Sequence, residues 1–402
     1  MQTASSRTNS TGGLGPSRAV SGPQHPHPYK PGRTPKPSSL RPHVLAKDRL
    51  RLWRPLAGRS SHGSGLPPGE DDLVRIVDVL AVAWAEGTSE TYGSGLLSFH
   101  IFCDSKAIPE ASRAPAAPTL IAAYISALAG FLSGGTISNY VSGIRAWHIL
   151  HGVAWAMNVA ELEALLRAAD RLTPASSKRQ ARMPYTTDIL VKLRPFFDLS
   201  KHLDAAVWSC LLTLFWSTSR GGEFTVKTLT SFDPAIHVKP SDVTEVSDRN
   251  SLEQTNFFLP WTKSAPHGES VYWAEQDGPS DPKSAFANHL AVNAPPPNAA
   301  LFSYIHGSGR RPLTKTALKK RLVEAFKAAQ IDFIHVHGIR IGSTVEYLLR
   351  GLPLEVVKAK GRWASDAFTL YLRRHAEIMA PYMQAKPQLH ANVLRIIMPR
   401  VR

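Results

Sequence analysis

Cysteine and long apolar runs are both scarce in this sequence. Its 402 residues include two cysteines, Cys103 and Cys210, which excludes a disulfide scaffold or a cysteine-rich zinc module and is typical of a reducing, intracellular compartment. The apolar runs, such as 79–85 and 211–216, fall far short of the roughly 20 residues that cross a bilayer. The first thirty residues lack the apolar core of a secretory signal. We therefore expect neither a membrane span nor secretion.

Acidic residues are also few. The chain has 31 Asp and Glu against 47 Lys and Arg, which gives a net charge of +16. A balance of this kind indicates a polyanionic partner, and nucleic acid is the first candidate.

The basic charge is densest at the N-terminus. Residues 1–70 hold 11 Lys or Arg against Asp48 and Glu70, a balance of +9 out of the +16. The segment is rich in Pro, Ser and Gly and shows no sustained apolar period, so we expect a disordered basic arm. Its role stays open between added phosphate contacts, a solvated tail and a basic nuclear address.

Apolar residues at helical spacing begin after this arm and predict two folded units. In the first, residues 71–172, helices are expected over 71–84, from a Ser89 N-cap onward, over 118–132 and 136–150, and from Glu161. A basic linker, 173–185, leads to the second unit, 186–385, and a tail, 386–402. In the second unit we expect apolar helices, a hairpin around the turn TKSAPHGES, a mostly loop region over 277–300, and helices from Lys315 onward.

Four features of the second unit carry chemistry only when they are taken together. Singly, each has an ordinary explanation as a helix-end ion pair, a surface lysine or a core aromatic. In chain order they are an arginine after a buried helix, a lysine in the hairpin turn, a His-x-x-Arg pair, and a Trp followed eight residues later by a Tyr. The residues are Arg220, Lys263, His337, Arg340, Trp363 and Tyr371.

This set supplies what phosphodiester transfer without a metal requires. Two guanidinium groups can clamp a phosphate and stabilise the charge that builds on it, and a phenol can attack phosphorus and hold it covalently. Lys263 can protonate the leaving alkoxide, and His337 can bind the phosphate or assist proton removal from Tyr371. His335 and His337 could instead suggest a metal, but no ligand at suitable spacing completes such a site. We expect no metal and no cofactor.

With these residues the chain resembles the tyrosine recombinase, or phage integrase, family over residues 71–385. The run GRWASDAFTLYLR looks particularly like recombinases of eukaryotic mobile elements of the Crypton and DIRS kind. The resemblance implies an all-α, SAM-like core-binding domain followed by a mainly helical α+β catalytic domain. It also implies a 3′-phosphotyrosine intermediate, double-stranded DNA as partner, assembly of a homo-tetramer on DNA, and a nuclear location in a eukaryote.

Two features differ from the family pattern. The step from Trp363 to Tyr371 is one residue shorter than in many bacterial relatives, and we recognise no pattern of an added C-terminal DNA-binding module after residue 385. Tyr347 is expected in the core, and Tyr382 is a poor alternative nucleophile. The main alternative function is a domesticated relative that binds DNA without cleaving it. A type IB topoisomerase would share the chemistry.

Overall fold

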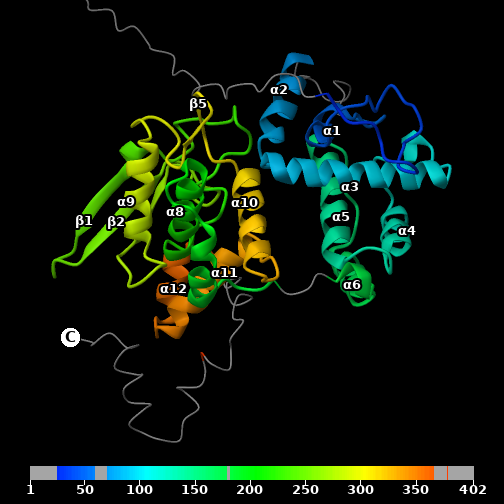
Figure 1. The fold of residues 1–402 in the computed structure, drawn as a ribbon. Helices are drawn as coiled ribbons and strands as arrows, with labels where there is room; N and C mark the ends of the chain where they lie inside the picture. Colours follow the sequence, from blue (N-terminus) through cyan, green and yellow to red (C-terminus); the bar gives the residue numbers. More distant parts are fainter. Residues whose placement is uncertain (1–24, 59–69, 179–181, 366–377, 379–402) are drawn as a thin grey trace, which may run out of the picture. The chain divides into compact units, whose positions relative to one another are not determined.

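The structure is a computed structural model that describes residues 25–58, 70–178, 182–365 and 378 (Figure 1). The chain divides into two compact units, Met1–Gln180 and Ala181–Arg402. The described part is mainly helical with two small sheets. In that part, no helix has the length and the apolar character that crossing a membrane requires.

The N-terminal unit is built from helices, close to those that the apolar spacing predicts. One correction concerns Ser89, because the second helix begins earlier, with Ala85 rather than Ser89 at its N-cap. The α-helices are α1 (Arg49–Leu52), α2 (Glu70–Ala81), α3 (Glu86–Ser105), α4 (Pro118–Leu128), α5 (Gly134–Leu150) and α6 (Val159–Arg171), and the 3₁₀ turns are Ala46–Asp48, Glu110–Ser112 and Ala175–Ser177.

Helices α3 and α5 cross at a reciprocal pair of glycines. A Cβ placed on Gly95 of α3 would lie 2.5 Å from the Cα of Tyr140, and one on Gly143 of α5 would lie 2.6 Å from the carbonyl oxygen of Tyr92. Only glycine therefore permits the two backbones to approach this closely. Buried side chains from both helices form the core of the unit around this crossing.

The expectation of a disordered arm over residues 1–70 is wrong for residues 25–58. The side chain of Trp53 is fully buried; its indole N–H donates to the carbonyl of Pro42 at 2.9 Å, and its own carbonyl accepts from the Trp147 indole at 2.7 Å. The apolar residues of this segment are too few to form a period of their own, but they complete the core of α3 and α5. Residues 1–24 and 59–69 lie outside the described residues.

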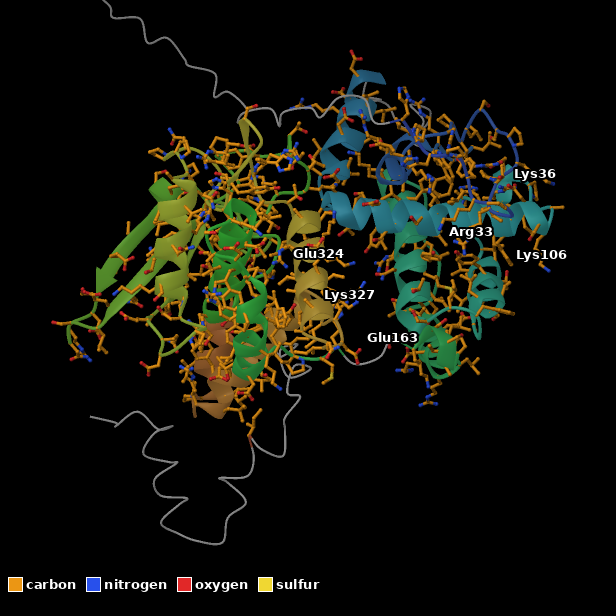
Figure 2. All side chains as sticks on the ribbon, viewed as in Figure 1. Arg33, Lys36, Lys106, Glu163, Glu324 and Lys327 are labelled. Carbon is orange, nitrogen blue, oxygen red and sulfur yellow. The ribbon has the colours of Figure 1, made fainter. Side chains whose placement is uncertain are left out.

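Basic residues of this segment divide into two groups. Some are used inside the fold: Arg41 pairs with Glu110, and Arg49, which is buried, donates to the carbonyl of Gly93 at 3.2 Å. Others are exposed, including Arg33 and Lys36, whose side chains are drawn with that of Lys106 in Figure 2. A part of the expected arm's charge thus stabilises the N-terminal unit.

The C-terminal unit surrounds one fully buried helix. Helix α8 (His202–Trp216) is largely apolar, and every residue from Asp204 to Trp216 is buried. Such a helix belongs in the centre of a domain. The other helices are α7 (Thr187–Leu193), α9 (Pro282–Asn293), α10 (Lys315–Ala328), α11 (His337–Leu349) and α12 (Leu354–Gly361), with α8 spanning His202–Trp216 and 3₁₀ turns at Arg194–Phe196 and Pro240–Asp242.

A three-stranded antiparallel sheet of order β1-β2-β3 is next to these helices (Figure 1). Its strands are β1 (Val243–Ser247), β2 (Glu253–Leu259) and β3 (Glu269–Trp273), and a second pair is formed by β4 (Tyr304–His306) and β5 (Gly309–Arg311). The expected hairpin is confirmed as β2 and β3, in which Phe257 is opposite Val271. Its buried face presents Phe257 and Trp273 to Phe286 of α9.

Two further expectations need correction. The region 277–300, expected to be mostly loop, contains α9, because Pro282 occupies the first turn of the helix, where proline is tolerated, and Asp281 caps it by accepting from the N–H groups of Lys283 and Ser284. Tyr185, placed in the linker, is fully buried. Its backbone carbonyl lies so close to Gly342 of α11 that a Cβ there would approach to 1.9 Å.

Candidate active site

Arg220 lies in a turn that follows the buried helix α8. Its backbone N–H donates to Glu223 Oε2 at 2.7 Å and its Nη1 to Glu223 Oε1 at 2.8 Å. Arg220 and Glu223 thus form an ion pair, and the Arg220 side chain remains 36% exposed. The pairing fixes the direction of the guanidinium group while leaving it accessible.

The same turn contains a strained residue. Thr218 has a φ of 55°, which is unusual for a residue with a branched Cβ. Three interactions hold it there: its N–H donates to the carbonyl of Phe215, its hydroxyl lies 2.7 Å from that of Ser343 on α11, and its carbonyl accepts from Arg340. Strained backbone of this kind clusters at functional sites.

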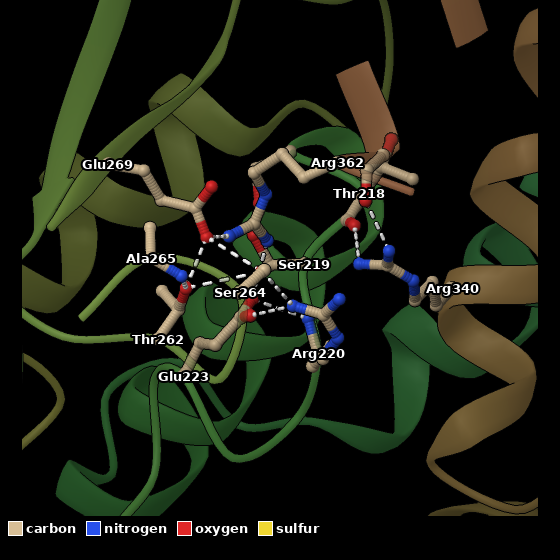
Figure 3. A network of polar contacts seen from close by, with 12 residues as sticks. Thr218, Ser219, Arg220, Glu223, Thr262, Ser264, Ala265, Glu269, Arg340 and Arg362 are labelled. Atoms are coloured by element: carbon tan, nitrogen blue, oxygen red, sulfur yellow. Dashed lines mark hydrogen bonds and ion pairs between the residues drawn. The ribbon is translucent and has the colours of Figure 1, made fainter. Parts of the chain in front are cut away.

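Arg340 is a buried cation at the centre of the site. It is 2% exposed, its Nη1 donates to the Thr218 carbonyl at 2.7 Å, and its Nη2 donates to the carbonyl of Gly361 at the end of α12. Its guanidinium carbon lies 4.2 Å from the centre of the Trp363 ring. Arg340 thus joins the turn after α8, α11 and the end of α12 at one point (Figure 3).

Trp363 follows α12 rather than lying within a helix. The helix ends at Gly361, and a Cβ on Gly361 would lie 1.5 Å from an atom of the indole ring. Glycine at this position therefore allows the indole to turn back toward Arg340. Tyr371, eight residues further on, lies outside the described residues, as does Tyr382.

His337 is half-buried at the start of α11, one helical turn before Arg340. Burial, followed by the nearby positive charges of Arg182, Arg340, Lys315 and Arg220, lowers the pKa of its imidazole below the usual value. Four cationic side chains thus act on one ring, and the space around it favours an anion.

Lys263 lies in the turn between β2 and β3, as expected, and its side chain is exposed. The turn is closed by Thr262, whose backbone N–H donates to the carbonyl of Ala265 and whose hydroxyl accepts from the N–H of Ala265, each at 3.0 Å. On the other side of Lys263, the Ser264 hydroxyl accepts from Arg220 Nη1 at 3.4 Å. The hairpin tip therefore lies beside the first arginine.

Arg362 and Glu269 are two site residues that the sequence pattern did not indicate. Arg362 bridges two carboxylates, donating from Nη2 to Glu223 at 2.6 Å and from Nη1 to Glu269 at 2.7 Å (Figure 3). Its partners are 139 and 93 residues away in the sequence, so no local pattern pairs them. The available signal was the position of Arg362 between Gly361 and Trp363.

Arg362 is a second strained residue at the site. Its φ of 59° and ψ of 46° place it in the left-handed region, which costs a residue with a Cβ roughly 1–2 kcal/mol. Although burial acts to raise the pKa of Glu223, the charge and hydrogen bonds of Arg362 and the hydrogen bonds of Arg220 lower it overall. Glu223 is therefore held in its charged form.

Two other residues considered in the sequence, Tyr347 and His335, lie in the C-terminal unit. Tyr347 packs against the core and donates to the carbonyl of Trp216 at 2.7 Å, as expected. His335 is exposed, and within the described ranges no group of three or more His, Cys, Asp or Glu could hold a metal ion. Five of the six expected site residues are described. Arg340 contacts the Trp363 ring, the charges of Arg340 and Arg220 act on His337, and the Lys263 turn is next to Arg220.

Comparison with known proteins identifies the fold. No protein-family model matches this sequence, and no curated protein sequence matches it either. A structure of XerH site-specific recombinase, bound to palindromic difH substrate in a post-cleavage complex, matches with a TM-score of 0.53 and 14% identity, over 85% of this chain and 96% of that chain. The mainly helical fold of this chain is thus similar to that of XerH recombinase.

Weaker likenesses are found to XerA recombinase (TM-score 0.34, 15% identity, 82% of this chain and 99% of that chain) and to a Flpe–Holliday junction complex (TM-score 0.32, 11% identity, 76% of this chain and 79% of that chain).

Proposed function

We propose that this protein is a site-specific DNA recombinase that cleaves and rejoins DNA through a 3′-phosphotyrosine intermediate at Tyr371. Three observations carry the proposal together: the charges of Arg220 and Arg340 both act on His337, Arg340 is bonded to the turn that contains Arg220, and Arg220 contacts the Lys263 turn. Trp363 is in contact with Arg340, and Tyr371 follows Trp363 by eight residues in the sequence.

In the proposed reaction, the Tyr371 oxygen attacks a DNA phosphorus and the bond from phosphorus to the 5′ oxygen breaks. The phenol proton leaves with the help of His337, whose lowered pKa favours the neutral, proton-accepting ring. The 5′ oxygen takes a proton from Lys263. Attack by a 5′ hydroxyl on the phosphotyrosine reverses these steps and rejoins the strand, so no external energy source is needed.

The two arginines differ in their contributions. The exposed guanidinium of Arg220 can bind a non-bridging phosphate oxygen directly. Arg340 is fixed by two carbonyl groups, which supports a preorganised charge that stabilises the pentacoordinate transition state with little reorganisation. The Trp363 indole packs on Arg340 and offers one N–H donor.

Double-stranded DNA is the proposed partner, supported by the net charge of +16 and by the exposed basic residues of both units. We also propose a core-binding and a catalytic domain that enclose DNA, assembly of a homo-tetramer on it, and an origin in a mobile element of the Crypton or DIRS kind. The run GRWASDAFTLYLR supports this origin.

The experiment is a covalent trapping assay on nicked duplexes with random sequence, in which a short cleaved strand diffuses away and prevents religation. Wild-type protein should form an adduct that survives SDS, whereas Tyr371→Phe should bind DNA without forming one. DNA binding by the wild type without any adduct would favour the alternative, a relative that binds DNA and does not cleave it. Absence of both binding and adduct would refute the proposal.

A further inference from the structure

Arg362 makes two short ion pairs at the site, and the proposed reaction does not use it. Its side chain is 9% exposed and lies between the carboxylates of Glu223, 8% exposed, and Glu269, 20% exposed. A planar guanidinium group can donate to two carboxylates at once, which the single ammonium of a lysine does less well. The contacts place one arginine between two acidic groups at the edge of a site for an anion.

Each of the two carboxylates is tied to a different part of the proposed machinery. Glu223 accepts two hydrogen bonds from Arg220. Glu269 accepts from the hydroxyl of Thr262 and, at 3.4 Å, from that of Ser264, the residues on either side of Lys263. A continuous chain of polar contacts therefore runs from the end of α12 to Arg220 and to the Lys263 turn (Figure 3).

Charge makes this arrangement costly without Arg362. Glu223 and Glu269 would then lose the cation that they share, and two partly desolvated carboxylates in a shared site repel one another, which displaces Glu269 from the turn that it holds. Loss of the arginine would also release the acceptor that holds the two hydroxyls flanking Lys263. Both effects would act on the placement of Lys263 more than on the fold of the unit.

We propose that Arg362 is a positioning residue for DNA cleavage, which neutralises Glu223 and Glu269 and holds the Lys263 turn against Arg220. The inference rests on the proposed function. Arg362 holds Glu269, and Glu269 holds the turn that contains Lys263. Arg362 therefore affects the step in which Lys263 gives a proton to the leaving 5′ oxygen.

The first test compares two leaving groups in the trapping assay. A 5′-bridging phosphorothiolate leaves as a thiolate, which needs no proton, so its cleavage does not depend on the placement of Lys263. Arg362→Asn keeps a residue that tolerates the left-handed backbone but removes the fork. We expect Arg362→Asn to slow cleavage of the normal phosphodiester about 100-fold. Cleavage of the phosphorothiolate should slow by less than about 5-fold, because only the oxygen leaving group needs the proton from Lys263.

Three further variants complete this test. Arg362→Lys should fall between wild type and Arg362→Asn, and adding Glu269→Gln to Arg362→Asn should recover part of the rate by removing an unpaired carboxylate. The control is Arg350→Asn, which removes another arginine–glutamate pair of the same unit, to Glu346, and should cleave both substrates like the wild type. Equal loss on both substrates, or no loss on either, would overturn the proposal.

The second test needs no DNA cleavage. Amide hydrogen exchange of residues 262–268 should rise about 10-fold in Arg362→Asn, the order expected when a local anchor of a loop is lost, and should not change in Arg350→Asn. Unchanged exchange in Arg362→Asn would overturn the positioning role even if the wild type proved inactive. An inactive wild type with raised exchange in Arg362→Asn would refute the proposed function alone.

Discussion

Arg340 and Arg220 carry the same charge but differ in burial, so we expect their substitution to affect protein stability differently. Arg340 is 2% exposed and bonded to two carbonyl groups, whereas the side chain of Arg220 is 36% exposed. Removal of a buried charged donor leaves its acceptors unsatisfied. Substitution of Arg340 should therefore reduce both stability and cleavage, whereas substitution of Arg220 should reduce cleavage alone.

We predict that Arg340→Ala and Arg220→Ala each reduce adduct formation roughly 100 to 1,000 fold, the usual cost of one preorganised charge donor. Arg340→Ala should in addition lower the free energy of unfolding by roughly 2–4 kcal/mol, since two hydrogen bonds to a charged group are lost. Denaturant unfolding and trapping on nicked DNA measure the two effects. Normal cleavage by both variants would mean that the phosphate binds elsewhere.

His289 reports on the core of the C-terminal unit. It is fully buried, its ring lies within hydrogen-bond distance of the Leu301 carbonyl and the Asn293 amide, and burial lowers its pKa to about 4. In the unfolded chain, the histidine takes up a proton below about pH 6.5, but in the folded chain only near pH 4. The stability linked to His289 is thus complete above pH 6.5 and declines as the pH falls toward 4.

We predict a loss of up to about 3 kcal/mol over this range, at about 1.4 kcal/mol per pH unit. His289→Gln should unfold with a shallower pH dependence between 6.5 and 4 than the wild type, as measured by urea unfolding at several pH values. The same substitution at the exposed His267 is the control. Parallel curves for His289→Gln and the wild type would contradict the assignment.

At the scale of elements, the segment 25–58 changes the account of the basic N-terminus. Leu50 and Trp53 are 3% and 0% exposed and pack with Leu96 and Trp147. The ring Nε2 of His151 lies 3.0 Å from the carbonyl oxygen of Leu50. The segment carries eight Lys or Arg against one Asp, so most of the charge first attributed to a disordered arm belongs to a folded part.

We predict that deletion of residues 1–58 destabilises the N-terminal unit far more than deletion of residues 1–24, because only the longer deletion removes the buried Leu50 and Trp53. The loss of the Trp53 side chain alone should cost about 3–5 kcal/mol. Calorimetry and hydrogen exchange of α3 and α5 measure this. Trp53→Ala in the full chain tests the same packing without a truncation. If the N-terminal unit remained stable after deletion of residues 1–58, the packing of this segment would contribute little to its stability.

The elements that the sequence predicted share one property: their pattern is local. The helices of the N-terminal unit and the hairpin of β2 and β3 follow apolar spacing and turn residues. The strand β1 was missed because it lies at the edge of its sheet and is mostly exposed, so it shows no alternation of apolar and polar residues. Helix α9 was missed because proline was interpreted as a breaker, although at Pro282 it begins the helix.

At the scale of the whole molecule, the same distinction applies to the site. Arg220, Lys263, His337, Arg340 and Trp363 were selected by residue type and order, which a sequence displays directly. The contacts that hold them together, between Arg362 and Glu269 and between Arg340 and the Thr218 carbonyl, join residues 93 and 122 positions apart. Such pairs exist only after the chain has folded, because neither partner has a neighbouring residue that indicates the other.

The most direct test of the central claim determines which atoms are joined when the protein reacts with DNA. Wild-type protein is trapped on a nicked duplex in the presence of EDTA, and the adduct is digested and analysed by mass spectrometry. We predict a 3′-phosphate linked to the peptide that contains Tyr371, together with a free 5′ hydroxyl on the other DNA end. A linkage to a 5′ phosphate, a linkage at Tyr382 or another residue, or an adduct that requires a metal would contradict the account.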